Sequence, residues 1–140
     1  MRQVFFAIFT LAAVLACQVQ DSDELTASDL WLRPMPPGQS MTAAYGTIYN
    51  PGPGVVRITG FSSPAFERVE LHETRMEQGI ARMRRIHSLE LQARDSVILE
   101  PGGKHLMMIG ARQSSDHQPV EIVVEIAGAG AVILQARQGQ

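Results

Sequence analysis

The sequence contains a single cysteine, Cys17, and no run of basic residues. One cysteine cannot form an internal disulfide, and the residues that follow it offer no thiolate for catalysis or metal binding. Aromatic residues make up only 6% of the chain, and its formal net charge is −2. Because a nucleic-acid-binding surface needs a concentrated basic face, nucleic acid is not an expected partner. Small molecules, ions or proteins are expected instead.

Long helical segments are missing as well. Gly and Pro interrupt the chain at short intervals, in “RPMPPGQS”, “NPGPG”, “SSP”, “EQG”, “PGG” and “AGAG”. Between these breaks lie about eight short segments of alternating or β-branched residues: “TAAYGTIYN”, “VVRITGFSS”, “RVELHET”, “IARMRRI”, “DSVILEP”, “HLMMIGA”, “PVEIVVEI” and “AVILQA”. The last two read as a closing hairpin, with Gly128 and Gly130 in its turn. The pattern predicts one all-β domain, a sandwich or barrel of Greek-key type.

The N-terminus reads as an export signal. Residues 1–16, “MRQVFFAIFTLAAVLA”, combine one early Arg with an apolar run too short to span a bilayer, which predicts a secretory signal peptide. An uncleaved membrane anchor is the alternative. Cys17 follows “VLA”, which resembles the lipobox of bacterial lipoproteins and predicts lipidation of Cys17, although ordinary cleavage after Ala16 would also fit. We expect residues 17–24 to form a polar tether and residues 25–140 to form the domain.

Two short stretches supply soft metal ligands. The stretch “VELHETRMEQGIARMRRI” predicts a hairpin turning between Glu77 and Gln78, so that residues whose numbers sum to 155 face each other. His72 would then lie opposite Met83, with Cβ atoms about 5 Å apart. In “LEPGGKHLMMIGA”, strand alternation puts His105 and Met107 on one face and Met108 on the other.

Two imidazoles and two thioethers make a soft, uncharged ligand set. Thioethers select Cu(I) over Zn(II), and neutral ligands allow the ion to leave without a charge penalty. The set therefore favours copper transport over copper catalysis. A blue-copper electron carrier is excluded because its site needs a Cys thiolate beside two His.

An enzyme is not expected from these residues. A catalytic zinc on His72 and His105 would need Glu70 or Glu73 as a further group, and Glu73 should point to the opposite face from His72. A Ser–His–Asp arrangement or a phosphate-binding Gly loop before a helix is not apparent either.

The stretch from “VELHET” to “HLMMIGA” resembles the PCu(A)C family of bacterial periplasmic copper chaperones. The family motif is a His, ten residues, a Met, twenty-one residues, then His-x-Met, and His72, Met83, His105 and Met107 match it. The resemblance extends over residues 28–137. It implies a cupredoxin-like β-sandwich that binds Cu(I) through these four residues. It also implies delivery of copper to the binuclear copper centre of cytochrome c oxidase, alone or with a thiol-containing partner chaperone.

The remaining methionines and histidines have simpler interpretations. Met108 should lie in the core and Met76 in a turn, whereas Met35 and Met41 flank “PPGQS” and either pack into the core or cover a binding face. His87 and His117 read as solvated loop residues.

Two features depart from many PCu(A)C relatives. Lys104 stands where many relatives have an aromatic residue, and the chain ends in “QARQGQ” without a His- and Met-rich tail. We expect an exported, lipid-anchored, monomeric Cu(I) chaperone. A metal-free β-sandwich scaffold lipoprotein and a copper buffer without a recipient are the alternatives.

Overall fold

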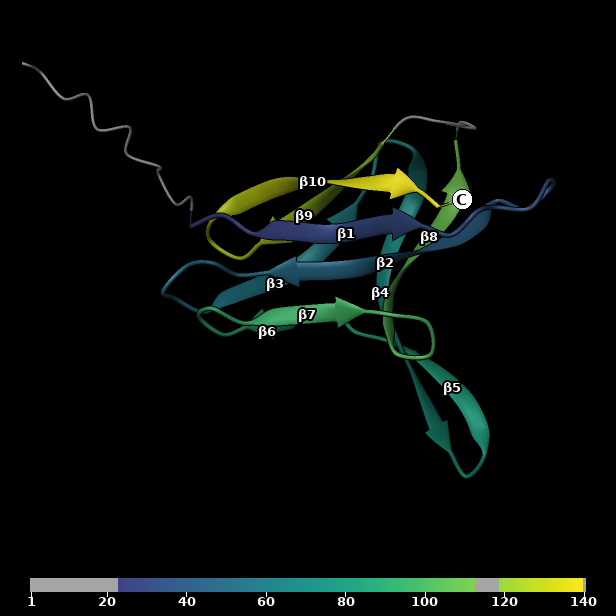
Figure 1. Ribbon diagram of the computed structural model, residues 1–140, viewed down its shortest axis with the longest axis horizontal. Helices are drawn as coiled ribbons and strands as arrows, with labels where there is room; N and C mark the ends of the chain where they lie inside the picture. Colours follow the sequence, from purple (N-terminus) through teal and green to yellow (C-terminus); the bar gives the residue numbers. More distant parts are fainter. Residues whose placement is uncertain (1–22, 113–118, 140) are drawn as a thin grey trace, which may run out of the picture.

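The structure, a computed structural model, describes residues 23–112 and 119–139. Within these ranges all helical or strand structure is β-strand, in the order β1 (Thr26–Leu32), β2 (Met41–Tyr49), β3 (Val56–Ser62), β4 (Phe66–Glu77), β5 (Ile80–Arg85), β6 (Leu89–Leu91), β7 (Ser96–Leu99), β8 (Lys104–Ala111), β9 (Val120–Ile126) and β10 (Gly130–Gln138) (Figure 1). The predicted all-β class is confirmed. No helix capable of crossing a bilayer is found in the described residues.

Several sequence predictions fall outside the described residues. These are the signal peptide over residues 1–16, lipidation of Cys17, all but the end of the tether, and the placement of His117. They remain predictions.

Seven strands form a closed ring. Hydrogen-bonded neighbours run in the order β4, β8, β2, β1, β10, β9 and β3, and β3 pairs back onto β4 at Phe61 and Val69. All of these pairings are antiparallel except the parallel contact of β1 with β10. β5, β6 and β7 add to the outside of the ring by pairing with β4, β3 and β2. The predicted sandwich or barrel is thus a single closed unit.

Strand alternation fills the interior of this ring. On β8, Leu106 and Met108 are fully buried in the apolar core, which also contains Ile122 and Val124 of β9. The prediction that Met108 packs in the core is confirmed. His105 and Met107 alternate with these residues and therefore lie on the outer face of the strand.

Two strands were not predicted from the sequence. β1 carries the polar residues of “TASDLWL” and has a register irregularity between Ser28 and Trp31, with Asp29 at a φ of 50°. This break hides the period-2 alternation that identifies a strand. β6 is only three residues long. The closing hairpin of β9 and β10 is confirmed, and Gly128 and Gly130 both have positive φ.

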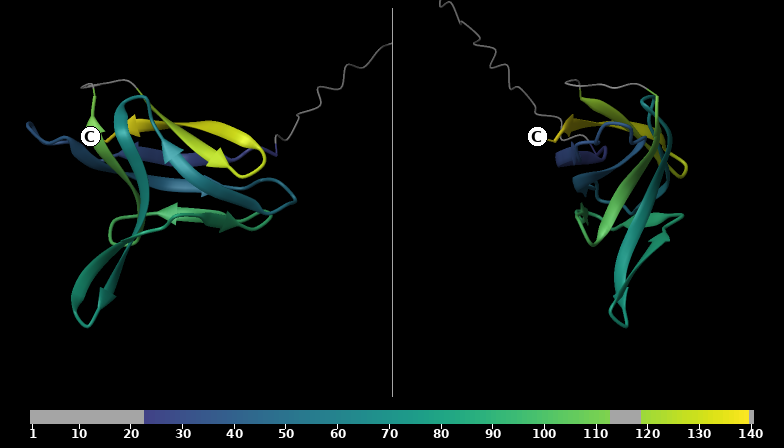
Figure 2. Two further views of the ribbon diagram at one scale, coloured as in Figure 1. Left: turned by 180° about the vertical axis from the view of Figure 1, so that it is seen from behind. Right: turned by 90° about the vertical axis from the view of Figure 1, so that its right-hand side faces the viewer.

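The β4–β5 hairpin leaves the body of the molecule. β4 is twelve residues long: its first part pairs with β8, and its far end pairs with β5 alone. The hairpin projects beyond the barrel in all three ribbon views (Figures 1 and 2). Every residue of β5 is exposed.

The predicted register of this hairpin is wrong by two residues. Gln78 and Gly79 form a two-residue turn, with φ values of 53° and 80°, so that Glu77 pairs with Ile80. Both values lie in the left-handed region that a type I′ hairpin turn requires. His72 consequently faces Arg85, and Met83 faces Thr74. Met76 also lies on β4, opposite Ala81, and not in the turn.

Candidate metal centre

The two predicted histidine ligands are direct neighbours. His72 on β4 pairs with His105 on β8, and the centroids of their rings are 6.0 Å apart at an interplanar angle of 75°. His105 is 5% exposed, and the His72 side chain is 15% exposed. Sequence analysis did not foresee this pairing, because β4 and β8 are far apart in the chain and no local pattern sets the register between them.

The two methionines lie on the same side of the sheet as the histidines. Met107 follows His105 on the outer face of β8. A register shift of two residues leaves every side chain on its original face, so Met83 still shares a face with His72. It is now a diagonal neighbour, for which Cβ atoms are typically about 7–8 Å apart, still within reach of a long side chain.

Three of the four predicted ligands line one hollow. Met83, His105 and Met107 border a hollow of about 470 Å³. The other lining residues come from the β1–β2 loop, from β2 and from β4: Arg33, Pro34, Pro36, Gln39, Met41, Thr42, Ala43, Tyr45 and Thr74. His72 does not line this hollow but lies against the ring of His105.

Backbone and aromatic contacts hold the His105 ring. Its Nδ1 is 3.1 Å from the carbonyl oxygen of Gly103, to which an Nδ1–H donates. The Tyr45 ring lies 6.4 Å away and itself packs on Trp31. With Nδ1 engaged in this way, Nε2 keeps its lone pair, which is the usual arrangement of a metal-binding histidine.

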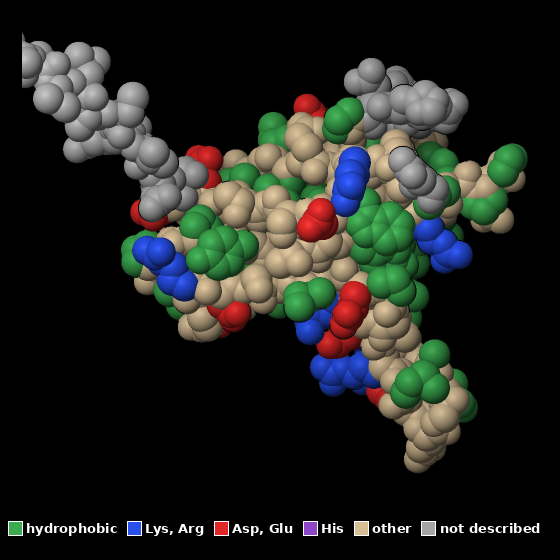
Figure 3. Space-filling model, in the orientation of Figure 1, with side chains coloured by type: hydrophobic (Ala, Val, Ile, Leu, Met, Phe, Trp, Pro, Cys, Tyr) green, Lys and Arg blue, Asp and Glu red, His purple; other side chains and the backbone are tan. Residues whose placement is uncertain are grey.

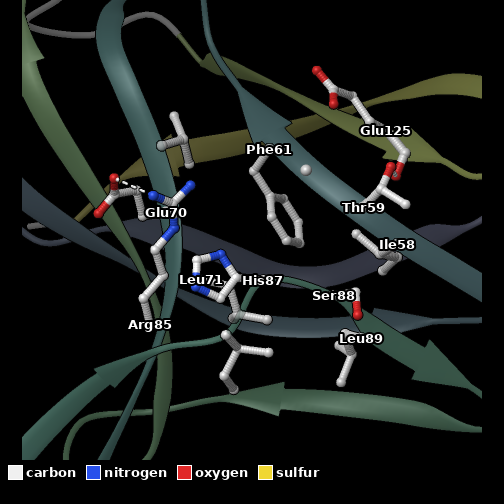
Figure 4. A pocket seen from close by; sticks show the side chains of 13 residues that line it. Ile58, Thr59, Phe61, Glu70, Leu71, Arg85, His87, Ser88, Leu89 and Glu125 are labelled. Atoms are coloured by element: carbon white, nitrogen blue, oxygen red, sulfur yellow. Dashed lines mark hydrogen bonds and ion pairs between the residues drawn. The ribbon is translucent and has the colours of Figure 1, made fainter.

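The His72 ring is held from its other nitrogen. Its Nε2 is 3.3 Å from Oε2 of Glu70, and the second oxygen of Glu70 is 3.1 Å from Nη1 of Arg85, the ion pair drawn in Figure 4. Among the described residues, His72 Nδ1 is buried without a hydrogen-bond partner. An unpaired buried nitrogen is costly unless a ligand satisfies it. Nδ1 is therefore the nitrogen whose lone pair this ring can offer to a metal ion.

The environment favours the neutral form of His72. Burial lowers the pKa of His72 below its ordinary value, and the nearby His105 and Arg85 lower it further, against the opposing effect of Glu70. Neutral imidazole is the form that binds a metal ion.

The charge of Lys104, the residue before His105, is balanced by a carboxylate on the face of the sheet opposite the histidines. Nζ of Lys104 is 3.2 Å from Oε1 of Glu73, and Oε2 of Glu73 is 2.6 Å from Nη2 of Arg75. Hydrogen bonds from Arg75 and Lys104 hold the pKa of the Glu73 carboxyl below its usual range. Figure 3 shows acidic and basic side chains side by side where the hairpin leaves the barrel.

A second, smaller hollow does not suit a soft ion. It measures about 230 Å³ and has no thioether among its described lining residues (Figure 4). Its polar lining residues are Thr59, Glu70, Arg85, His87, Ser88 and Glu125, and the others are apolar. In residues 23–112 and 119–139, no three His, Cys, Asp or Glu side chains are grouped to hold a metal ion. On the sheet face that carries the two histidines, the candidate donors beside them are the thioethers of Met83 and Met107.

Comparison with known proteins identifies the family. Residues 25–137 match the family model described as “Putative lipoprotein LpqE-like”. The chain belongs to the LpqE-like lipoprotein family. A relative from Leifsonia xyli subsp. xyli (strain CTCB07), named “Putative lipoprotein Lxx21020”, is 32% identical over 94 residues. That match covers 66% of this chain and 55% of the relative, so the LpqE-like chain spans little more than half of the relative's length.

Solved structures establish the fold of the LpqE-like chain as that of PCuAC domains, as the sequence resemblance predicted. The copper-bound PCuAC domain from PmoF2 superposes with a TM-score of 0.64 at 21% identity, over 80% of this chain and 89% of that one. The apo PCuAC domain from PmoF1 superposes with a TM-score of 0.65 at 19% identity, over 82% of this chain and 92% of that one. The solution structure of CuI-DR1885 from Deinococcus radiodurans superposes with a TM-score of 0.61 at 22% identity, over 87% of this chain and 80% of that one.

Proposed function

We propose that this LpqE-like protein binds one Cu(I) through His72, Met83, His105 and Met107 and passes it to another protein. The observation that carries the proposal is the His72–His105 pair. Each ring has one nitrogen held by an oxygen acceptor and one nitrogen available, and thioethers lie on the same face of the sheet. Two structures of the same fold are described by name as copper-bound, which supports the choice of ion.

The chemistry of these donors favours a carrier over an enzyme. All four are neutral when they bind, so the ion can leave without separating opposite charges in a buried site. Thioethers and imidazoles together suit the soft Cu(I) ion. Met83 is 50% exposed, which leaves one side of the ion accessible to the ligands of an acceptor.

The proposed location rests on the N-terminal sequence, and the proposed recipient rests on the resemblance to the PCu(A)C family. The lipidated Cys17 anchors the protein to a membrane on the periplasmic side, where it acts as a monomer. The recipient is the copper-bearing subunit of cytochrome c oxidase or a thiol-containing copper chaperone. Family membership supports the lipoprotein assignment.

An anaerobic Cu(I) titration against a chromophoric chelator tests the proposal. The protein should take up one equivalent, and the Met83→Leu, Met107→Leu double variant should lose it. Because leucine conserves the side-chain volume, we expect the double variant to lose less than about 1.5 kcal/mol of stability. Met35→Leu, which removes a thioether that does not line the hollow, is the matched control and should bind normally.

The alternatives predict different results. If the wild-type protein takes no copper from the chelator, the metal-free scaffold is correct and the carrier proposal fails. A protein that binds copper but does not transfer it to the oxidase subunit or to a thiol chaperone is a buffer.

A further inference from the structure

A third thioether borders the hollow that contains the proposed ligands. Met41, the first residue of β2, lines this hollow together with Met83, His105 and Met107. In the β2–β8 ladder Ala43 pairs with Met107, and Met41 pairs with Ile109. Met41 and Met107 are therefore diagonal neighbours on one face of the sheet, and Ala43, which lies opposite Met107 on that face, has only a methyl side chain.

Met41 does not serve the apolar core. It is 48% exposed, whereas Met108 on the other face of the same ladder is fully buried. The interpretation of Met41 as core filler is thus wrong, and the alternative, that it covers a binding face, agrees with its position. A side chain left half in water gives up part of the stabilisation that full burial provides. What it offers instead is a flexible thioether.

Hydrogen bonds hold the residues on both sides of Met41. Ala111 N–H donates to the carbonyl oxygen of Ser40 at 3.0 Å, and the Thr42 hydroxyl donates to the carbonyl oxygen of Arg33 at 2.6 Å. The residues on both sides of Met41 are therefore held by hydrogen bonds. From this fixed position the half-exposed Met41 side chain, with three rotatable bonds, borders the hollow.

The sheet order places Met41 opposite Met83 across the proposed site. β8, with His105 and Met107, lies between β4 on one side and β2 on the other, and β5 extends from β4. Met83 approaches from the β5 side and Met41 from the β2 side. An ion on His105 and Met107 therefore has a thioether available from either direction.

We propose that Met41 is an exchange ligand for the soft cation and takes the place of Met83 when the ion enters or leaves the hollow. The inference rests on the proposed function. One Cu–S bond to Met41 forms as the Cu–S bond to Met83 breaks. Copper stays Cu(I), no proton moves, and the ligand charge does not change because both donors are neutral thioethers.

A double-mutant cycle tests the exchange. Cu(I) affinity is measured by chelator competition for the wild type, Met41→Leu, Met83→Leu and the double variant. If either thioether can stand in for the other, each single change is partly compensated. The fold-loss of Cu(I) affinity in the double variant should then exceed the product of the fold-losses in the two single variants by about tenfold.

The matched control removes an exposed thioether outside the hollow. Met76 is 68% exposed, lies on the same sheet face as Met83, and does not line the hollow. Met76→Leu should leave the affinity unchanged, alone or combined with Met83→Leu. In methionine-methyl NMR of the Met83→Leu variant, Cu(I) should shift the Met41 methyl signal and not that of Met76.

The outcomes separate this inference from the proposed function. If the wild type binds Cu(I), but the single losses multiply and the Met41 methyl signal does not shift, the exchange role of Met41 is overturned and the carrier function stands. If the wild type takes no Cu(I) from the chelator, the carrier function fails, and the role of Met41 fails with it. Urea unfolding of each variant checks that the fold is retained.

Discussion

The β9–β10 and β4–β5 hairpins show how differently similar local structures are used. Both contain left-handed turn residues, but the strands of β9–β10 lie in the closed barrel and bury Ile122, Val124 and Leu134. Every residue of β5 is exposed, including Ile80 at 58%. The first hairpin contributes to the core. In the second, only the part of β4 that lies in the barrel contributes to the core, whereas the exposed side chains of β5 include the proposed ligand Met83 and surface charge.

The largest expected effect is a difference in stability loss between a buried substitution in the β9–β10 hairpin and an exposed one in the β4–β5 hairpin. Ile122→Ala leaves a cavity in the core and should lower the free energy of unfolding by about 2–5 kcal/mol. Ile80→Ala changes an exposed side chain and should alter it by less than about 0.5 kcal/mol. Urea denaturation of both variants makes the comparison. Equal losses would mean that the β4–β5 hairpin is part of the cooperative core.

The junction between the hairpin and the barrel should control metal affinity. Glu70 contacts His72 on its own strand and Arg85 on β5, so it holds the imidazole with Nδ1 available. Glu70→Gln removes the charge that fixes this ring. We expect about a 10- to 100-fold loss of Cu(I) affinity, the usual effect of losing such a partner.

A matched substitution controls for the loss of an Arg–Glu ion pair. Glu90 pairs with Arg57 at an exposed position between β6 and β3, away from both histidines. Glu90→Gln should bind Cu(I) as the wild type does. Unchanged affinity in Glu70→Gln would show that the carboxylate does not position His72.

The smallest effect concerns the pH dependence of the metal-free protein. Burial lowers the pKa of His72 in the folded state below its ordinary value of 6.5. As the pH falls through 6.5, the unfolded chain takes up a proton that the folded chain resists, so stability should fall until the folded pKa is passed. For one group the slope is at most about 1.4 kcal/mol per pH unit.

The His72→Gln variant isolates the contribution of His72 to the pH dependence of stability. Urea unfolding at pH 7.5 and pH 5.0 should show a larger loss of stability for the wild type than for the variant. The difference between the two proteins removes the contribution of other groups that titrate in the same range. An identical loss would show that His72 is as easily protonated in the folded protein as in the unfolded chain.

Sequence reasoning succeeded where the signal is local. Gly and Pro breaks marked the turn of the β9–β10 hairpin, and alternation put Met108 in the core and Met107 outside. It failed where the backbone departs from a simple pattern. Because Gln78 adopts a left-handed conformation in the turn, the observed β4–β5 register differs by two residues from the predicted one. The irregularity in β1 hid the alternation that identifies a strand.

The sequence by itself determined the β class, the four candidate ligands and the face on which each lies, because a period of two is a property of each strand alone. Only the tertiary structure decided which strands are neighbours. The β4–β8 ladder put His72 beside His105, and the β2–β8 ladder brought Met41 to the hollow. These contacts join residues distant in the chain, and their register depends on turn geometry and on burial of the shared core, which no short stretch of sequence contains.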